Sequence, residues 1–248
     1  MALKIVKESV LTEDQHRISC LHYASGHDRC LVISHGFYNS KDALVLDDLA
    51  RSLASEYDVV LFDLRGHGES SGLFTWISKE GNDLKAVLAA YRGRYRRTGL
   101  VAFSLGGSIA INTLAREPLV DSFVCVSAPA SLWGVNYHFW ELSFQKDFVY
   151  TLIDKAGRKG KGVRPGPFWL KKERPIDNVG KLVAPVLFIH GTRDWVVKPS
   201  HSQRLFDRTV SPKKLVIFKD APHAEYLLRD NRERFIAEVR AWFTATLR

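Results

Sequence analysis

Short apolar runs alternate with helix-like segments along most of the chain, and this alternation restricts the folds that the sequence can adopt. Eight runs have the length and composition of strands: residues 5–10, 18–23, 30–34, 58–62, 99–103, 122–127, 185–189 and 214–218. Helical periodicity follows in residues 42–54, 82–91, 105–116, 200–208 and 231–246. Because repeated strand–helix units place successive strands parallel, the pattern predicts an α/β fold. We expect a doubly wound, mainly parallel sheet of about eight strands that opens with an antiparallel pair.

The alternation stops once, between residues 128 and 178. This segment is rich in aromatic side chains: Trp133, Tyr137, Phe139, Trp140, Phe144, Phe148, Tyr150, Phe168 and Trp169. Its first half has helical spacing, and its second half is rich in glycine and proline, which favours a loop. We therefore expect a small helical cap, residues 128–178, inserted into one core unit formed by residues 1–127 and 179–248.

The composition excludes several classes of protein. With 248 residues and 46% hydrophobic residues, the chain can bury a sizeable core. No apolar run reaches membrane-spanning length, and the first residues do not resemble a signal peptide, so we expect a cytoplasmic protein without integral membrane association. Three widely spaced cysteines, without a Cys-x-x-Cys pair, predict buried thiols rather than disulfides or a metal site: Cys20, Cys30 and Cys125.

The net charge of +9 is unevenly distributed, with a basic segment at residues 155–174. No nucleic-acid recognition motif accompanies this charge, so we do not expect a nucleic-acid partner. A solvated basic surface is the simpler interpretation of the segment. The alternative is attraction of an anionic leaving group, such as the coenzyme A or phospholipid head group of a substrate.

A serine lies at the turn between the predicted strand 99–103 and the predicted helix 105–116. Ser104 has small residues two positions before and after it, Ala102 and Gly106. This is the form of a nucleophile elbow, Gly-x-Ser-x-Gly, with alanine in place of the first glycine. Small flanking residues are needed because the helix passes close to the strand. The pattern predicts a nucleophilic serine held above the sheet.

Two other predicted strands end in residues that can activate a serine. Asp194 follows strand 185–189, and His223 follows strand 214–218. The carboxyl ends of parallel strands meet at one edge of the sheet, where active sites of such folds lie. Asp63, after strand 58–62, competes with Asp194 for the role of the acid, but its position before Arg65 fits the organisation of a loop better.

Five stretches in this order resemble the α/β-hydrolase superfamily, and the resemblance covers nearly the whole chain. They are residues 35–37, 63–72, 102–107, 190–194 and 221–223. The chain is most similar to small serine esterases and acyl hydrolases with a short helical cap. The resemblance implies a catalytic triad in the chain order Ser104, Asp194, His223. It also implies an oxyanion hole formed by the backbone N–H groups of Phe37 and Leu105.

The leading functional hypothesis is a hydrolase of carboxylic esters with small to medium apolar acyl groups, acting through an acyl-enzyme. Two alternatives stay open: the same chemistry on a thioester or lysophospholipid, and a non-catalytic binding protein on the hydrolase scaffold. The expected partner is a small-molecule ester or thioester, and no cofactor or metal is expected. The expected substrate-binding residues are aromatic: Phe37, Trp133, Trp140 and Trp195.

Overall fold

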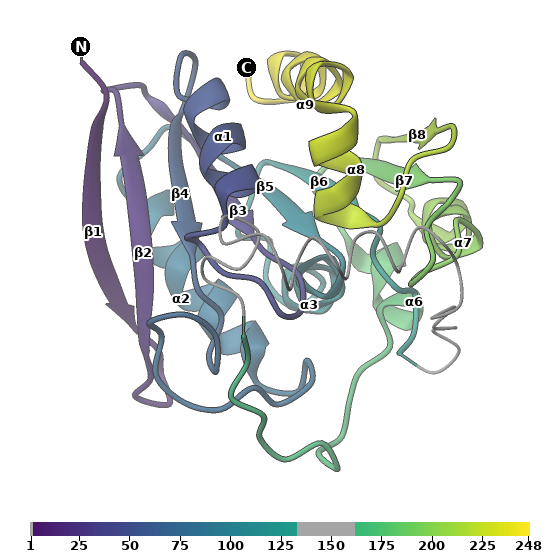
Figure 1. Ribbon diagram of the computed structural model, residues 1–248, viewed down its shortest axis with the longest axis horizontal. Coiled ribbons are helices and arrows are strands. Elements are labelled where there is room, and N and C mark those ends of the chain that lie inside the picture. Colours follow the sequence, from purple (N-terminus) through teal and green to yellow (C-terminus); the bar gives the residue numbers. More distant parts are fainter. Residues whose placement is uncertain (1, 133–161) are drawn as a thin grey trace.

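A computed structural model describes residues 2–132 and 162–248, which form one eight-stranded sheet between two layers of helices (Figure 1). The sheet order is β1-β2-β4-β3-β5-β6-β7-β8. The first strand pairs antiparallel with the second, the second antiparallel with β4, and all other neighbours are parallel. The predicted α/β class, with a mainly parallel sheet that opens with an antiparallel pair, is therefore confirmed. The strands are β1 (Lys4–Leu11), β2 (Arg17–Ala24), β3 (Arg29–Ser34), β4 (Asp58–Phe62), β5 (Arg97–Phe103), β6 (Ser122–Val126), β7 (Val186–Gly191) and β8 (Lys213–Phe218).

The two faces of the sheet carry separate hydrophobic clusters, each covered by its own helices (Figure 1). One face packs against α1 (Leu44–Leu53), α8 (Ala224–Asp230) and α9 (Arg232–Thr246). The other packs against α2 (Glu80–Arg92), α3 (Leu105–Leu114), α6 (Pro175–Asn178) and α7 (Ser200–Arg208). A short 3₁₀ helix, η1 (Val179–Lys181), follows α6.

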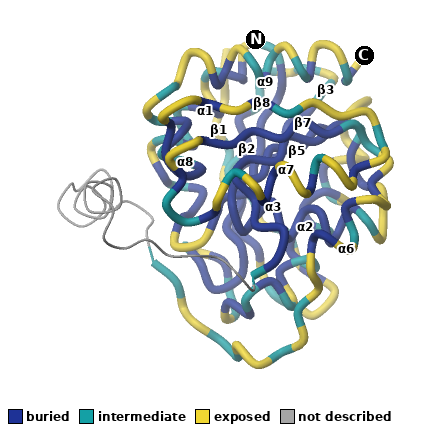
Figure 2. The backbone as a smooth tube through the Cα atoms, turned by 90° about the vertical axis from the view of Figure 1, so that its right-hand side faces the viewer, coloured by how far each residue is buried: buried dark blue, intermediate teal, exposed yellow. Residues whose placement is uncertain are grey.

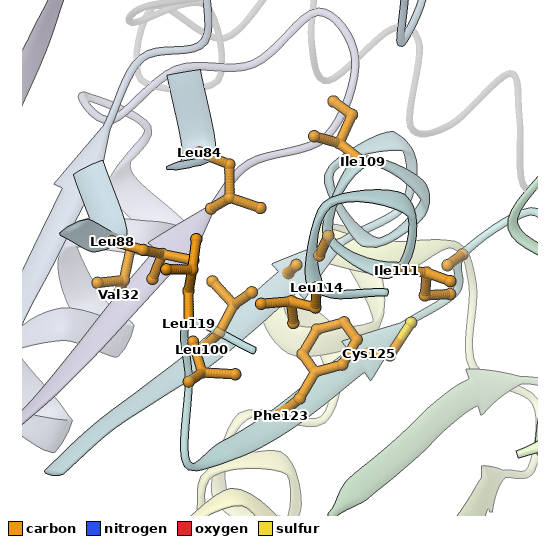
Figure 3. Packing of buried hydrophobic residues seen from close by; sticks show 14 of the residues in the cluster. Val32, Leu84, Leu88, Leu100, Ile109, Ile111, Leu114, Leu119, Phe123 and Cys125 are labelled. Atoms are coloured by element: carbon orange, nitrogen blue, oxygen red, sulfur yellow. The ribbon is translucent and has the colours of Figure 1, made fainter. Parts of the chain in front are cut away.

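The central strands are apolar on both sides because both sides are covered. In β5, Leu100 and Ala102 belong to one cluster, whereas Val101 and Phe103 belong to the other. Figure 3 shows the cluster that contains Leu100, in which side chains of α2 and α3 pack onto β5 and β6. In Figure 2 the central strands are buried along nearly their whole length, whereas exposed positions recur along the helices, the loops and the edge strands β1 and β8. This double burial explains why the strands appear in the sequence as nearly continuous apolar runs.

Two helices were not expected from the sequence: α6, in a segment predicted to be a loop, and α8. Seven residues directly after His223 form α8, and only Asn231 separates α8 from α9. The three cysteines are buried free thiols, as predicted. The first half of the expected cap, residues 133–161, lies outside the described residues. Within the described remainder of the predicted cap, residues 162–174 contain no helix and follow an extended path along the outside of the fold (Figure 1), whereas residues 175–178 form the short helix α6 where a loop was predicted. No helix of the described residues is both long and apolar enough to cross a membrane.

Candidate active site

Ser104 occupies a strained turn between β5 and α3. Its backbone has φ 49° and ψ −117°, a conformation that L-residues avoid and that costs about 1–3 kcal/mol. Its N–H donates to the carbonyl oxygen of Val126 at 2.7 Å, which ties the turn to the end of β6. The side chain is almost buried, with 8% of the residue surface exposed. A strained backbone therefore falls on the residue predicted to be the nucleophile.

The small residues around Ser104 are required by close packing. A Cβ atom added to Gly106 would lie 2.5 Å from the carbonyl oxygen of His35 and 2.8 Å from Oγ of Ser34. Ala102 is fully buried, and its methyl group belongs to the core cluster below α3. The alanine that replaces the first glycine of the elbow is thus accommodated in the core, whereas Gly106 has no room for a side chain.

The structure brings Ser104, His223 and Asp194 together from three different strand ends. Nε2 of His223 lies 2.8 Å from Oγ of Ser104, and Nδ1 of His223 lies 2.7 Å from Oδ2 of Asp194. A carboxylate can only accept, so Nδ1 carries the proton and Nε2 is free to accept the serine proton. The three residues are 7–8% exposed, so water screens this chain of hydrogen bonds only weakly.

Asp194 is held as a carboxylate by four hydrogen-bond donors. Oδ1 accepts the N–H groups of Val196 at 2.9 Å and Val197 at 2.7 Å. Oδ2 accepts the Nδ1–H of His223 and lies 3.1 Å from Nε2 of His190, whose N–H also donates to the carbonyl oxygen of Val197 at 2.7 Å. Burial by itself raises the pKa of Asp194, but the two histidines outweigh it and hold this pKa well below its usual range. The sequence does not single out His190, near the end of β7, as a partner of the acid four residues later.

Phe37, the predicted oxyanion donor, follows Gly36, whose carbonyl group is held by a hydrogen bond. Nδ1 of His35 donates to the carbonyl oxygen of Gly36 at 2.7 Å, and Nε2 of His35 accepts the N–H of Leu64 at 3.1 Å. The Gly36 carbonyl and the Phe37 N–H belong to one planar peptide group, so the His35 ring also sets the direction of that N–H. Among the described residues, neither the Phe37 N–H nor the Leu105 N–H donates to another group. Both donors are therefore available to a ligand.

Comparison with known proteins identifies the family of the chain. The model of the alpha/beta hydrolase family matches residues 31–244. The chain belongs to the alpha/beta hydrolase family. Family membership supports a hydrolytic enzyme and agrees with the chain order of the three polar residues.

Individual relatives are distant. Human alpha/beta hydrolase domain-containing protein 17B is 26% identical over 223 residues, which cover 86% of this chain and 67% of that protein. Mouse mitochondrial palmitoyl-protein thioesterase ABHD10 is 25% identical over 190 residues, or 73% of this chain and 63% of that protein. The solved structure of the Pyrococcus furiosus esterase Pf2001 superposes with a TM-score of 0.79 at 24% identity, covering 98% of this chain and 92% of the other. At this identity the structural likeness shows a shared fold.

Aromatic rings surround the candidate site of this alpha/beta hydrolase. The ring of Trp195 lies 6.3 Å from that of His223. The Phe37 side chain is 43% exposed and stacks on Trp76 at 5.4 Å and 27°. Trp76, which the sequence analysis missed, lies in the loop before α2 and has a left-handed backbone, φ 56°. Phe37 and Trp195 therefore lie at the site, whereas the other two predicted substrate-binding residues, Trp133 and Trp140, lie outside the described residues.

Asp63, the competing candidate for the acid, faces a different set of groups. Its carboxylate accepts the N–H groups of Lys41 at 2.8 Å and Glu69 at 2.9 Å. The Lys41 ammonium lies 3.1 Å from Asp63 and 2.7 Å from both Asp42 and Glu69. These three carboxylates are spaced closely enough to bind a cation, but the lysine already supplies the positive charge between them. Asp63 thus organises the loop after β4.

Proposed function

We propose that this protein is a serine hydrolase that cleaves carboxylic esters of small to medium apolar acyl groups through an acyl-enzyme intermediate. The observation that carries the proposal is the hydrogen-bonded series Ser104–His223–Asp194, with 2.8 and 2.7 Å between successive side chains. A serine hydroxyl becomes a useful nucleophile only when a neighbouring base takes its proton. The protonation states inferred from the hydrogen bonds give His223 that ability.

The reaction follows from these positions. Oγ of Ser104 attacks the ester carbonyl carbon while its proton passes to Nε2 of His223. The negative charge on the former carbonyl oxygen is stabilised by the N–H groups of Phe37 and Leu105. The tetrahedral intermediate expels the alcohol, which takes the proton from His223, and the acyl group stays on Ser104. Water then repeats the sequence and releases the acid, with Asp194 stabilising the imidazolium in both halves.

The chemistry needs only protein side chains and water, so the proposal includes no cofactor and no metal. The acyl group would lie against two aromatic rings at the site, the exposed ring of Phe37 and the partly buried ring of Trp195 next to His223. We also propose Trp133 and Trp140 of the expected cap as substrate contacts, because their spacing of seven residues in the sequence predicts that they share one face of a helix. Their substitution by alanine is expected to shift acyl-chain preference.

A thioester or lysophospholipid substrate is the second candidate, since the same triad can cleave either. The mouse relative is named as a palmitoyl-protein thioesterase, and the basic segment 155–174 could attract an anionic leaving group. A non-catalytic binding protein is the third candidate. It is disfavoured because ligand binding alone does not require three side chains aligned for proton transfer.

Covalent labelling with a fluorophosphonate probe tests the proposed function. The wild-type protein is expected to take up one label, and Ser104→Ala to take up none. Ser108→Ala is a matched control, because Ser108 lies one turn further along α3 and its hydroxyl donates to the carbonyl of Pro129 rather than to a histidine. Labelling that survives Ser104→Ala contradicts the assignment. Turnover of p-nitrophenyl esters of increasing acyl length, beside acyl-coenzyme A and amide substrates, separates the three candidates.

A further inference from the structure

Glu225, in the first turn of α8, contacts the turn that carries the proposed oxyanion donor. Its Oε1 atom accepts the N–H of Gly36 at 2.8 Å and Nδ2 of Asn39 at 3.2 Å. These two groups stand at the two ends of the turn formed by residues 36–39, which we call the oxyanion turn. One carboxylate oxygen of a helix 189 residues away in sequence therefore holds both ends of the oxyanion turn.

The oxyanion turn needs such support because its backbone is strained. Tyr38 has φ 59°, a left-handed conformation that costs an L-residue roughly 1–2 kcal/mol. Its side chain is 42% exposed, so packing around Tyr38 provides little of the restraint. Asn39, by contrast, is 2% exposed, and its Oδ1 accepts the N–H of Ser40 at 3.0 Å. This second bond fixes the amide so that its Nδ2 points to Glu225, and the rare backbone conformation is held from outside the turn.

The support acts close to the nucleophile. A Cβ atom added to Gly36 would lie 3.1 Å from Cβ of Ser104 and 3.2 Å from Oε1 of Glu225. The glycine is thus packed closely against both the serine and the carboxylate. An oxyanion donor works only when it is about 2.7–3.1 Å from the developing charge, so a small shift of this turn removes much of its effect.

We propose that Glu225 is a positioning residue that aligns the Phe37 N–H for the oxyanion by holding Gly36 and Asn39. The inference rests on the proposed serine-hydrolase function and adds a task to the segment after β8. His223 and Glu225 are two residues apart at the start of α8. One helix start therefore sets the positions of both the general base and the oxyanion donor, which must act on the same substrate carbonyl.

Two conservative variants of Glu225 distinguish the effect of side-chain length from the effect of its negative charge. Glu225→Asp keeps a carboxylate but is one methylene too short to reach Gly36. Glu225→Gln keeps the reach and an acceptor oxygen but removes the charge. No described residue donates to Oε2 of Glu225, so an amide nitrogen in its place displaces no hydrogen-bond donor.

With p-nitrophenyl butyrate as substrate, Glu225→Asp is expected to lower kcat about 10- to 100-fold, below the loss from deleting an oxyanion donor, with little change in KM. The Ki of a trifluoromethyl ketone, whose adduct forms the same oxyanion, is expected to rise by a similar factor. Glu225→Gln should restore most of the activity, to within about threefold of wild-type kcat, since a neutral acceptor also binds the two donors.

Glu233→Asp is the control, because Glu233 has an equivalent place in the first turn of α9, is exposed, and lines a surface pocket with Ser52 and Arg240 rather than the oxyanion turn. Thermal unfolding confirms that each variant is folded. Wild-type kcat in Glu225→Asp overturns the inference. Equal losses in Glu225→Asp and Glu225→Gln also overturn it, because they would assign the effect to charge rather than to alignment. A wild-type protein without esterase turnover or labelling contradicts the proposed function itself, and the inference with it.

Discussion

Substitution of Gly106 by alanine is expected to damage both stability and catalysis, although alanine is the better helix former. Gly106 is the second residue of α3, where alanine is favoured over glycine by about 1 kcal/mol. The added Cβ would however lie 2.5 Å from the carbonyl oxygen of His35, well inside any normal contact. Separating the two atoms to a tolerable 3.0 Å requires a movement of at least about 0.5 Å.

The clash between the added Cβ and the His35 carbonyl oxygen is relieved most easily by movement of His35. The end of β3 is fixed by its pairing with β5, in which Ser34 opposes Ala102. The residue that can move is therefore His35, which begins the loop that presents the Phe37 N–H. Overpacking of this kind costs about 1–3 kcal/mol, which exceeds the gain in helix propensity. Because displacement by about 1 Å can cost 100-fold in rate, we expect kcat to fall about tenfold or more.

Gly93→Ala is the matched control for this prediction. Gly93 ends α2 with φ −70°, and no atom lies within 4 Å of its added Cβ. Alanine there should stabilise the protein by about 0.4–1 kcal/mol through the unfolded state, with unchanged kcat. Urea unfolding and p-nitrophenyl ester turnover measure both effects. A Gly106→Ala protein as stable and as active as Gly93→Ala would refute the argument from close packing.

Two further outcomes follow from the titratable groups. Asp194→Asn should lower kcat by roughly 1,000-fold or more, whereas Asp63→Asn should mainly lower stability; the reverse pattern in steady-state kinetics would show that the acid is misassigned. Burial and the neighbouring His35 lower the pKa of His67 to about 3 from its usual 6.5. The His67 side chain therefore stays neutral in the folded protein, whereas it takes up a proton in the unfolded chain. Stability should then fall as the pH drops from about 6.5 towards 3, by up to about 1.4 kcal/mol per pH unit. His67→Asn, which keeps a donor for the carbonyl of Arg65, should lose roughly 1–2 kcal/mol less between pH 7 and 5 in urea unfolding; an equal loss in both proteins contradicts the assignment.

The sheet could be predicted from the sequence because burial on both faces leaves a local trace. Each residue of β6 is buried, and the same is true of β4 and β7, so these strands appear as short uninterrupted apolar runs. Ser104 follows β5 directly, and Asp194 and His223 lie three and five residues after the ends of β7 and β8, which is why the three residues could be found at strand ends. The helix α8 left no comparable trace. Its seven residues are too few for a clear period, and α9 follows after one residue.

The supporting contacts could not be predicted, because they join segments far apart in the chain. The carboxylate of Glu225 and the N–H of Gly36 are 189 positions apart, and no local pattern relates them. The ring of His190 is near Asp194 in sequence, but its role depends on a bond from the Ser202 hydroxyl at 2.6 Å that orients it. Motif residues indicate the chemistry of a site, whereas the residues that align them can be recognised only in the completed fold.

Backbone strain at the site shows how the fold supplies that alignment. Three residues at strand ends or helix starts around the candidate site have left-handed φ values without being glycine: Ser104 (49°), Ser127 (50°) and Ala224 (45°). Nothing in these residue types predicts that conformation. The Ala224 N–H donates to Oγ of Ser127 at 3.2 Å, so two of the strained residues hold each other across the ends of β6 and β8. Because Ala224 separates His223 from Glu225, its unusual backbone lets the first reach the serine and the second reach the oxyanion turn. These strained conformations persist because the buried sheet holds the residues around them in place. The strands of this sheet are also the part of the fold most clearly visible in the sequence.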